Sequence, residues 1–292
     1  GAEKYSLGLK NMSDAIALRN KLIDSCEQAA QTDDVETRKK LLTAVVVGGG
    51  ATGVELAAEI VEFWQENLEN YYQDTRIKKV EVRVLLVASS AELLPQFPPQ
   101  LRQIAYETLT EKGVKIKTNA SVTEVTAESV KLADGKIIAA QTVIWVAGVK
   151  AKNLTFAGSQ IAETAPNGRL NLDPYLRLLG QENVYALGDM AGTSPMLAQV
   201  AVQQAKTVAR NIAASLSHKP LQIFKYRQKG LLVSLGQWQA AGEIWGLTLH
   251  GRAMWWLWRT IYLFNFLSWR KRFRIAAEWT INLFYPRDIT RL

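Results

Sequence analysis

The residues best suited to chemistry are three glycines, Gly48, Gly50 and Gly53, in the pattern Gly-x-Gly-x-x-Gly. They directly follow the apolar run 44–47 and open a segment whose apolar residues recur at helical spacing. At such a strand-to-helix turn, the first glycine permits the tight turn and the second lets backbone N–H groups approach a pyrophosphate. The third allows close helix–strand packing, and the helix N-terminus directs partial positive charge toward the phosphates. The pattern predicts a dinucleotide site, with an ordinary tight turn as the alternative.

The end of the second predicted strand, 80–87, bears on which nucleotide binds. An NAD site usually carries an acid there for the ribose 2′-hydroxyl, but here Ser89 and Ser90 follow and the first acid is Glu92. The missing carboxylate also removes a repulsion against the 2′-phosphate of NADP. Both serines could donate to that phosphate, and Arg83 is near in sequence. We therefore expect NADH or NADPH to be accepted.

The composition is that of a folded protein of about two domains, with 292 residues, 48% of them hydrophobic and 21% charged. The single cysteine, Cys26, rules out an internal disulfide framework and a Cys-x-x-Cys redox pair in this stretch. The two histidines, His218 and His250, are far apart and have no ligand neighbours at metal-binding spacing. No metal site is expected.

The net charge of +8 is concentrated at the C-terminal end. Residues 251–292 hold eight basic side chains, two acids and five of the nine tryptophans. Mixed basic and aromatic residues favour an anionic membrane surface over nucleic acid, which is not expected as a partner. The apolar run 253–267, broken by Arg259 and Asn265, is shorter than the roughly 20 residues of a spanning helix. We expect it to lie in the membrane interface; a homodimer interface, where tryptophan and arginine are also common, is the alternative.

The elements that must position the glycine turn alternate along the chain. Strand, glycine turn, helix and strand form a βαβ unit of a parallel sheet. The spacing predicts helices over 11–30, 51–72, 100–112 and 196–214, strands over 44–47, 80–87, 142–148 and 184–187, a polar connector over 31–40, a β-rich stretch over 226–249, and one or two amphipathic helices in the last forty residues.

Three segments in fixed order carry a family resemblance: GGGATGVE at 48–55, TVIWVAGV at 142–149 and NVYALGDMA at 183–191. The order resembles flavoprotein reductases with two dinucleotide-binding domains, in which the nicotinamide domain is inserted in the flavin domain. The resemblance implies that Asp189 accepts hydrogen bonds from the flavin ribityl chain and that the chain returns to the flavin domain at Gly148. The alternative for Gly188-Asp189 is a helix-capping turn.

Two further features narrow the resemblance. The segment AQVAVQ at 198–203 is similar to the AQxAxQ motif of the type II NAD(P)H:quinone oxidoreductases, and the tail is similar over 229–230, 255–259, 272–274 and 286–289. The similarity runs from about residue 1 to 292 and is closest to the cyanobacterial and plastid branch. It implies that Gln199 and Gln203 lie beside the flavin where a quinone approaches, the alternative being two exposed helix glutamines. It also implies that Glu55 lies near the nicotinamide–flavin contact and is linked to quinone protonation, the alternative being an ordinary first-turn acid.

The resemblance implies an α/β fold, namely the two-dinucleotide-binding-domain flavoprotein fold lacking its N-terminal FAD ADP-binding half, with a C-terminal amphipathic helical membrane anchor. The chain then resembles a fragment, and FAD retention is expected to be weak. The expected divisions are a linker helix and flavin-domain remnant over 1–43, an NAD(P)H-binding domain over 44–147, the second half of the FAD domain over 148–220, and a membrane-associating region over 221–292.

The implied activity is hydride transfer from NADH or NADPH to FAD, followed by two-electron reduction of a membrane quinone without proton pumping. The implied location is peripheral, on the cytoplasmic face of a plasma membrane or thylakoid. Alternatives are a soluble reductase of the same superfamily with another acceptor, and a non-catalytic nucleotide-binding, membrane-associated protein. The predicted site residues are, for catalysis, Glu55, Gln199 and Gln203 and, for cofactor binding, Gly48, Gly50, Thr52, Gly53, Glu55, Ser89, Gly148, Gly188, Asp189, Ala198 and Gln199.

Overall fold

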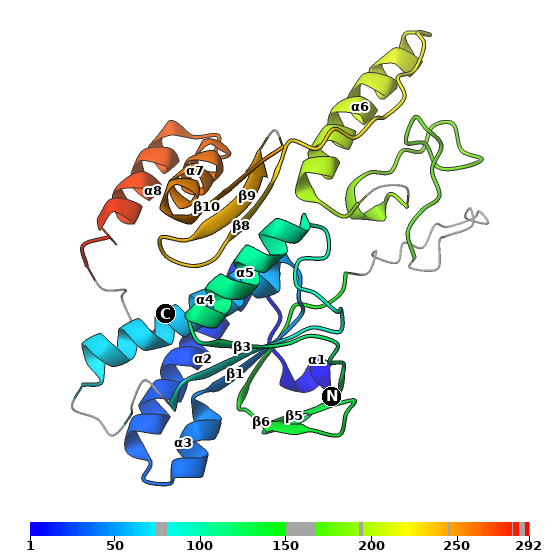
Figure 1. The fold of residues 1–292 in the computed structure, drawn as a ribbon. Coiled ribbons are helices and arrows are strands. Elements are labelled where there is room, and N and C mark those ends of the chain that lie inside the picture. Colours follow the sequence, from blue (N-terminus) through cyan, green and yellow to red (C-terminus); the bar gives the residue numbers. More distant parts are fainter. Residues whose placement is uncertain are drawn as a thin grey trace. The chain divides into compact units, whose positions relative to one another are not determined.

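The computed structural model describes residues 1–73, 77, 81–149, 168–192, 195–244, 246–281, 283–285 and 290–291. The chain divides into two compact units (Figure 1). Unit 1 comprises Gly1–Ala147 and Gly230–Leu292, and unit 2 comprises Gly148–Lys229. Residues 1–43 and 230–292 therefore lie in the same unit as the predicted nucleotide domain.

Unit 1 is built on a four-stranded parallel sheet in the order β3-β2-β1-β7. The strands are β1 (Thr43–Val47), β2 (Arg83–Val87), β3 (Val114–Lys117) and β7 (Thr142–Trp145). Helix α4 (Ala51–Tyr71) connects β1 to β2, and α5 (Pro99–Glu111) connects β2 to β3. The predicted βαβ unit is confirmed.

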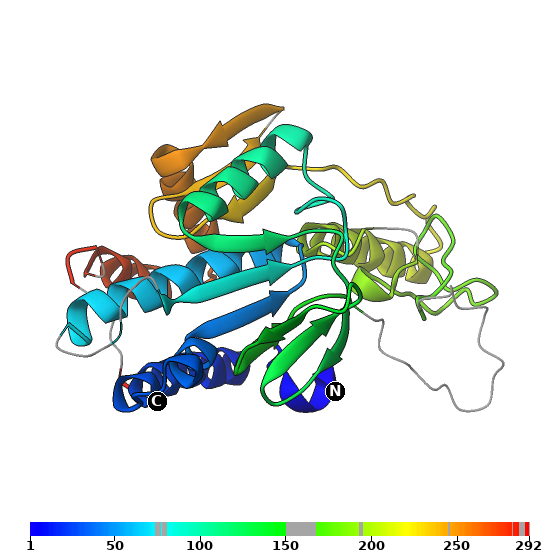
Figure 2. The same cartoon turned by 60° about the horizontal axis from the view of Figure 1, so that its bottom comes forward.

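Both faces of this sheet are buried, as expected for parallel strands. Alternate side chains such as Val46 and Leu86 pack among α2 (Met12–Gln31), α4 and α5. The intervening side chains, such as Val45 and Leu85, pack on a three-stranded meander. The meander consists of β4 (Val122–Val125), β5 (Ser129–Leu132) and β6 (Ile137–Ala139), and Figures 1 and 2 show it on the opposite side of the sheet from α5. The sheet is thus held rigidly between two apolar layers.

Local capping explains where the N-terminal helices begin. Short α1 (Ala2–Tyr5) precedes α2, which starts at a capping box formed by Asn11 and Asp14. The segment predicted as a polar connector contains α3 (Val35–Leu41), so that prediction was wrong. The Asp34 side chain accepts the Thr37 N–H at 2.8 Å and starts the helix. Arg38 then pairs with Glu81 at 3.0 Å, a contact that no local pattern reveals.

The C-terminal part of unit 1 is an antiparallel meander followed by two helices. The strands are β8 (Leu231–Ser234), β9 (Ala240–Ile244) and β10 (Leu247–His250), and the helices are α7 (Gly251–Phe264) and α8 (Trp269–Ile281). Helix α7 buries Met254 and Trp255 against this meander. A Cβ at Gly242 would lie 2.8 Å from the Met254 Cε, so glycine permits the close approach. Among the described residues, no helix combines the length and apolarity needed to cross a bilayer.

Unit 2 contains α6 (Ala198–Leu216) and the short 3-10 helix η2 (Gly188–Met190). The strand predicted over 184–187 is absent, because Tyr185 makes only an isolated bridge to Arg177. Its apolar side chains instead pack beside Leu176 and Leu178 in a small core. Here the apolar run indicated a buried segment, but this segment does not pair with a neighbouring strand. The tail motif at 286–289 lies outside the described residues.

Candidate functional site

The glycine loop has the close contacts that its pattern predicts. Gly48 has φ +134°, and a Cβ on it would lie 2.9 Å from the Ala147 nitrogen. A Cβ on Gly53 would lie 1.8 Å from the Gly48 carbonyl oxygen, so α4 approaches the loop too closely for a side chain there. A Cβ on Gly50, by contrast, would meet no protein atom within 4 Å. Gly48 and Gly53 are therefore required for packing, whereas Gly50 faces open space.

The position of the loop in the sheet is that of a nucleotide site. The loop follows β1, whose neighbours β2 and β7 lie on opposite sides of it, so the topology switches direction there. Ligands of open α/β sheets bind at such a switch point, beyond the carboxyl ends of the strands. Gly50 is the N-cap of α4 and provides no side-chain cap, while the exposed Thr52 lies in its first turn. First-turn N–H groups have no partner within a helix, so this loop fits a pyrophosphate.

Ser89, Ser90 and Arg83, the residues considered for the 2′-phosphate of NADP, do not lie together at the end of β2. Ser89 is exposed at the carboxyl end of the strand. The Ser90 hydroxyl donates to the Glu92 carbonyl oxygen at 2.7 Å, and the Glu92 carboxylate pairs with Arg102 of α5. Arg83 is the first residue of β2 and lies at the opposite end of the strand. Strands rise about 3.3 Å per residue, so Arg83 is far from Ser89 and its expected contribution was wrong.

Glu55 lies on α4 beyond the first turn, which contains no acid, so the first-turn alternative does not apply. Its Oε1 accepts a hydrogen bond from the Ser234 backbone N–H at 2.9 Å. Burial raises the pKa of Glu55, the Ser234 hydrogen bond opposes that rise, and the charge of Glu59 adds to it. This is a carboxyl group with a raised proton affinity on the helix that the glycine loop opens. Such a group is suited to general acid chemistry.

The Gly188-Asp189 turn belongs to unit 2 and is held from two sides. The Gly188 N–H donates to Gln204 Oε1 at 2.7 Å, and Arg169 Nε donates to the Asp189 carbonyl oxygen at 3.1 Å. Gly188 has φ +68°, a conformation that favours glycine. The Asp189 side chain is exposed and makes no hydrogen bond with the part of the chain that the structure describes. Its carboxylate is therefore available as an acceptor for hydroxyl groups.

The two motif glutamines on α6 bind the backbone of the segment before β8. Gln203 Nε2 donates to the Arg227 carbonyl oxygen at 2.8 Å, and Gln203 Oε1 accepts the Arg227 N–H at 3.1 Å. Gln199 Oε1 accepts the Lys229 N–H at 3.3 Å. Ala198, the first residue of α6, is exposed. The structure thus gives both amides a positioning role, and direct contact with a quinone stays a prediction.

Sequence reasoning missed two further polar residues of α6. Gln204 and Asn211 are fully buried. Gln204 holds Gly188, while Asn211 Oδ1 accepts the Gln222 N–H at 2.8 Å. The available signal was that both amides fall at helical spacing on the face of Val200 and Val208, because a polar group on an apolar face needs a partner. Gly148, the first residue of unit 2, has φ +78° and is exposed.

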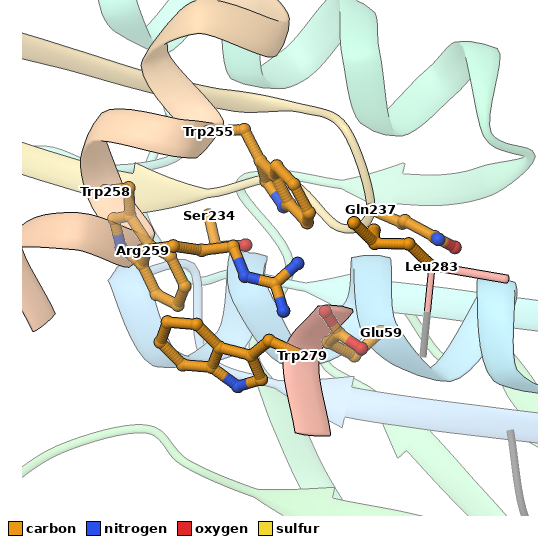
Figure 3. Close-up of a pocket in the computed structure, with 8 residues that line it drawn as sticks. All are labelled: Glu59, Ser234, Gln237, Trp255, Trp258, Arg259, Trp279 and Leu283. Atoms are coloured by element: carbon orange, nitrogen blue, oxygen red, sulfur yellow. The ribbon is translucent and has the colours of Figure 1, made fainter. Parts of the chain in front are cut away.

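A pocket of about 320 Å³ in unit 1 was also missed (Figure 3). Its walls come from α4, the β8–β9 turn and the C-terminal helices. The Arg259 guanidinium lies between two indole rings, 4.2 Å from the centre of Trp255 and 4.4 Å from that of Trp279. The lining residues are Glu59, Ser234, Gln237, Trp255, Trp258, Arg259, Trp279 and Leu283. These residues are spread from position 59 to position 283, so no local sequence motif could have predicted the pocket.

The outer surface of α7, α8 and their connection exposes large apolar side chains. Leu267 is 99% exposed and Phe273 is 74% exposed. Arg272 lies over the rings of Phe264 and Trp269, at 5.2 and 4.7 Å from their centres. Several large apolar side chains exposed on neighbouring elements make this surface a candidate interaction site.

Comparisons with known proteins agree with this geometry. The family model described as pyridine nucleotide-disulphide oxidoreductase matches residues 1–205, and the NDH2 C-terminal domain model matches residues 228–288. The chain is 32% identical over 295 residues to the type II NADH:quinone oxidoreductase Ndh of Mycobacterium tuberculosis, covering 97% of this chain and 63% of that protein. It is 32% identical over 264 residues to the type II NADH:quinone oxidoreductase of Haemophilus influenzae, covering 84% of this chain and 58% of that protein.

A solved structure shows the same fold. NDH2 from Plasmodium falciparum in complex with NADH superposes with a TM-score of 0.87 at 21% identity, covering 99% of this chain and 76% of that chain. The family match over residues 1–205 shows that the chain belongs to the pyridine nucleotide-disulphide oxidoreductase family. Within that class, the two family models and the curated relatives together place it among the type II NADH dehydrogenases. The chain spans less than two thirds of the length of those two relatives.

Proposed function

We propose that the protein containing this chain oxidises NADH or NADPH and passes the electrons through FAD to a membrane quinone, without proton pumping. One observation supports this most directly: a Gly-x-Gly-x-x-Gly loop at the switch point of a parallel sheet, with Glu55 on the helix that it opens. The names of the relatives, which are NADH:quinone oxidoreductases, supply the acceptor.

The residues of the chain divide the work. The loop from Gly48 to Gly53 would bind the nucleotide pyrophosphate at the α4 N-terminus. Asp189, fixed by Gln204 and Arg169, would accept hydrogen bonds from the ribityl hydroxyls of FAD. FAD, when bound, supplies the chemistry that accepts a hydride and releases electrons in turn. Glu55 would hold a proton for the quinone, and the glutamines of α6 would position the segment that ends at Lys229.

Disulfide reduction by this chain is not supported. Cys26 is buried on α2, and burial raises the pKa of its thiol to about 12. A thiol with that pKa carries almost no thiolate near neutral pH, and thiolate is the reactive form.

Two measurements test the proposal. Calorimetry with NADH and NADPH examines the loop directly, because unit 1 contains it whether or not FAD is bound. The protein that contains this chain, supplied with FAD, should then oxidise NADH in the presence of a short-chain quinone. Absence of binding for both nucleotides, together with absence of FAD binding, would refute the proposal.

The first prediction concerns nucleotide choice. Ser89→Asp restores a carboxylate at the carboxyl end of β2, where it can accept from a ribose 2′-hydroxyl and repel a 2′-phosphate. The ratio of kcat/KM for NADPH to that for NADH should fall by roughly tenfold, equivalent to about 1.4 kcal/mol. Arg83→Gln, at the far end of the same strand, should leave the ratio unchanged. An unchanged ratio in Ser89→Asp would remove Ser89 from the site.

We also propose that the exposed surface of α7 and α8 binds an anionic membrane, on the cytoplasmic face of a plasma membrane or thylakoid. Leu267, Trp269 and Phe273 would enter the interface, with neighbouring basic side chains directed toward lipid phosphates. A lipid-soluble quinone could then reach the protein without crossing water. A second copy of this chain is the competing occupant of the surface.

The second prediction follows from that surface. Leu267→Asp should reduce co-sedimentation with anionic vesicles by about tenfold or more, since burying a leucine contributes about 1.5–3 kcal/mol. The control is Leu216→Asp on α6, where the leucine is 81% exposed. Equal losses in both variants would exclude a specific surface. A change from dimer to monomer in Leu267→Asp, with vesicle binding intact, would assign the surface to self-association.

A further inference from the structure

Helix α4 contains five acids, and the first three, Glu55, Glu59 and Glu62, are spaced by four and three residues, which places them on one helical face. The last residue of β8 and the turn that follows it bind the first and the third of these acids. Ser234 N–H donates to Glu55 at 2.9 Å, and Gln237 N–H donates to Glu62 Oε2 at 2.8 Å. The middle acid, Glu59, lines the pocket instead. The three acids therefore form a row that runs from Glu55 past the pocket.

The pocket provides room and polar groups for water beside this row. The pocket, of about 320 Å³, has room for several water molecules. The Trp258 indole nitrogen is buried and has no hydrogen-bond partner among the described residues. Water in the pocket does not reach that nitrogen, so the polar residues that line the pocket, Glu59, Ser234, Gln237 and Arg259, are the groups that water there can bind. Ser234 lines the same pocket while its backbone holds Glu55, so the pocket reaches from Glu59 to the immediate neighbour of Glu55.

The charges around the row are coupled. The pKa of Glu55 is raised by burial and by the charge of Glu59, while the Ser234 hydrogen bond opposes the rise. The pKa of Glu62 is likewise raised by burial and by Glu59, against the opposing effect of Lys112. From α7, burial lowers the pKa of Arg259 while Glu59 opposes that shift, and burial and Glu55 raise the pKa of Tyr262. Glu59 thus interacts with groups on both sides of it.

We propose that Glu59 and the tryptophan-lined pocket supply protons to Glu55. Glu59 takes a proton from pocket water and passes it to Glu55 through intervening water, and Arg259 lines the same pocket. The inference rests on the proposed function, in which Glu55 protonates the quinone. The overall balance is NADH plus quinone plus one proton giving NAD⁺ plus quinol. The hydride supplies two electrons and one hydrogen, and the remaining proton enters through Glu59.

Glu59→Gln tests this relay because it keeps the shape of the side chain and removes the exchangeable carboxyl proton. In FAD-supplied protein, quinone reduction should fall by roughly tenfold, while reduction of ferricyanide, which takes up no proton, should be unchanged. Imidazole in the buffer should restore quinone reduction by carrying protons into the pocket, and Glu59→Asp should stay close to the unmodified protein. A structural role for Glu59 would show no such rescue.

A second readout needs no cofactor. Infrared titration of the protonated carboxyl band, assigned with Glu55→Gln, should show Glu55 titrating at lower pH in Glu59→Gln than in the unmodified chain. Glu69→Gln, which alters an exposed acid further along α4, should change neither the titration nor turnover. Suppose that the unmodified protein reduces quinone. If Glu59→Gln is then not slowed, or if imidazole does not restore its rate, the relay is overturned and the proposed function stands. No quinone reduction by the unmodified protein would overturn the proposed function and the relay with it.

Discussion

Gly53→Ala is expected to disrupt the nucleotide loop and lower the free energy of unfolding by about 3 kcal/mol or more. The added Cβ would lie 1.8 Å from the Gly48 carbonyl oxygen and 3.0 Å from its carbon, so helix and loop must separate. The helix preference of alanine over glycine, about 1 kcal/mol, does not offset that clash. Thermal unfolding followed by circular dichroism measures the change.

Gly50→Ala separates binding from folding at the same loop. Its Cβ would meet no protein atom within 4 Å, and Gly50 has φ −79°, which alanine adopts readily. The unfolding free energy should therefore change by less than about 1 kcal/mol. Affinity for NADH should fall by about tenfold or more, because the second glycine admits the pyrophosphate to the backbone. Gly8→Ala, exposed and equally open, should change neither quantity. Normal NADH binding by Gly50→Ala would place the nucleotide elsewhere.

Glu55→Gln is expected to slow quinone reduction by about a hundredfold, the usual contribution of a positioned general acid. Glutamine can still accept the Ser234 N–H, so the hydrogen bond at 2.9 Å should survive. Reduction of ferricyanide by NADH should be nearly unchanged, because it requires no proton delivery. Equal loss with both acceptors would indicate a role for Glu55 in nucleotide binding or in packing instead.

The same variant should change how stability depends on pH. The folded chain raises the pKa of Glu55 above its unfolded value, so the native state binds more protons between the two values. The contribution of Glu55 to stability is then fully present below the unfolded pKa and is lost as pH rises through the folded pKa. In Glu55→Gln this loss should be absent, leaving a flatter plot of melting temperature against pH. An identical slope in both proteins would mean that the half-burial of Glu55 does not raise its pKa.

Much of the fold, including the glycine loop, was predictable because the signals are local. The strand ending at Val47, the glycine loop and the apolar face of α4 occupy one stretch of sequence, and their spacing alone defines the turn. The helix that carries Gln199 and Gln203 was similarly evident from periodicity. Two local predictions failed for different reasons. The connector before β1 contains a capped helix, and the segment around Tyr185 is buried without a ladder partner.

The sequence by itself thus determined that a strand-to-helix turn could hold a pyrophosphate and that the C-terminal residues are basic and aromatic. Only the tertiary structure decided that the C-terminal tryptophans and Arg259 line a pocket with Glu59 of α4. Glu55 and Ser234 are 179 positions apart, yet the hydrogen bond between them helps to set the pKa of Glu55. Arg83 and Ser89 are six positions apart, yet they lie at opposite ends of β2. Spacing along a chain fixes neighbours within one element, whereas packing between elements fixes charge, burial and access to water.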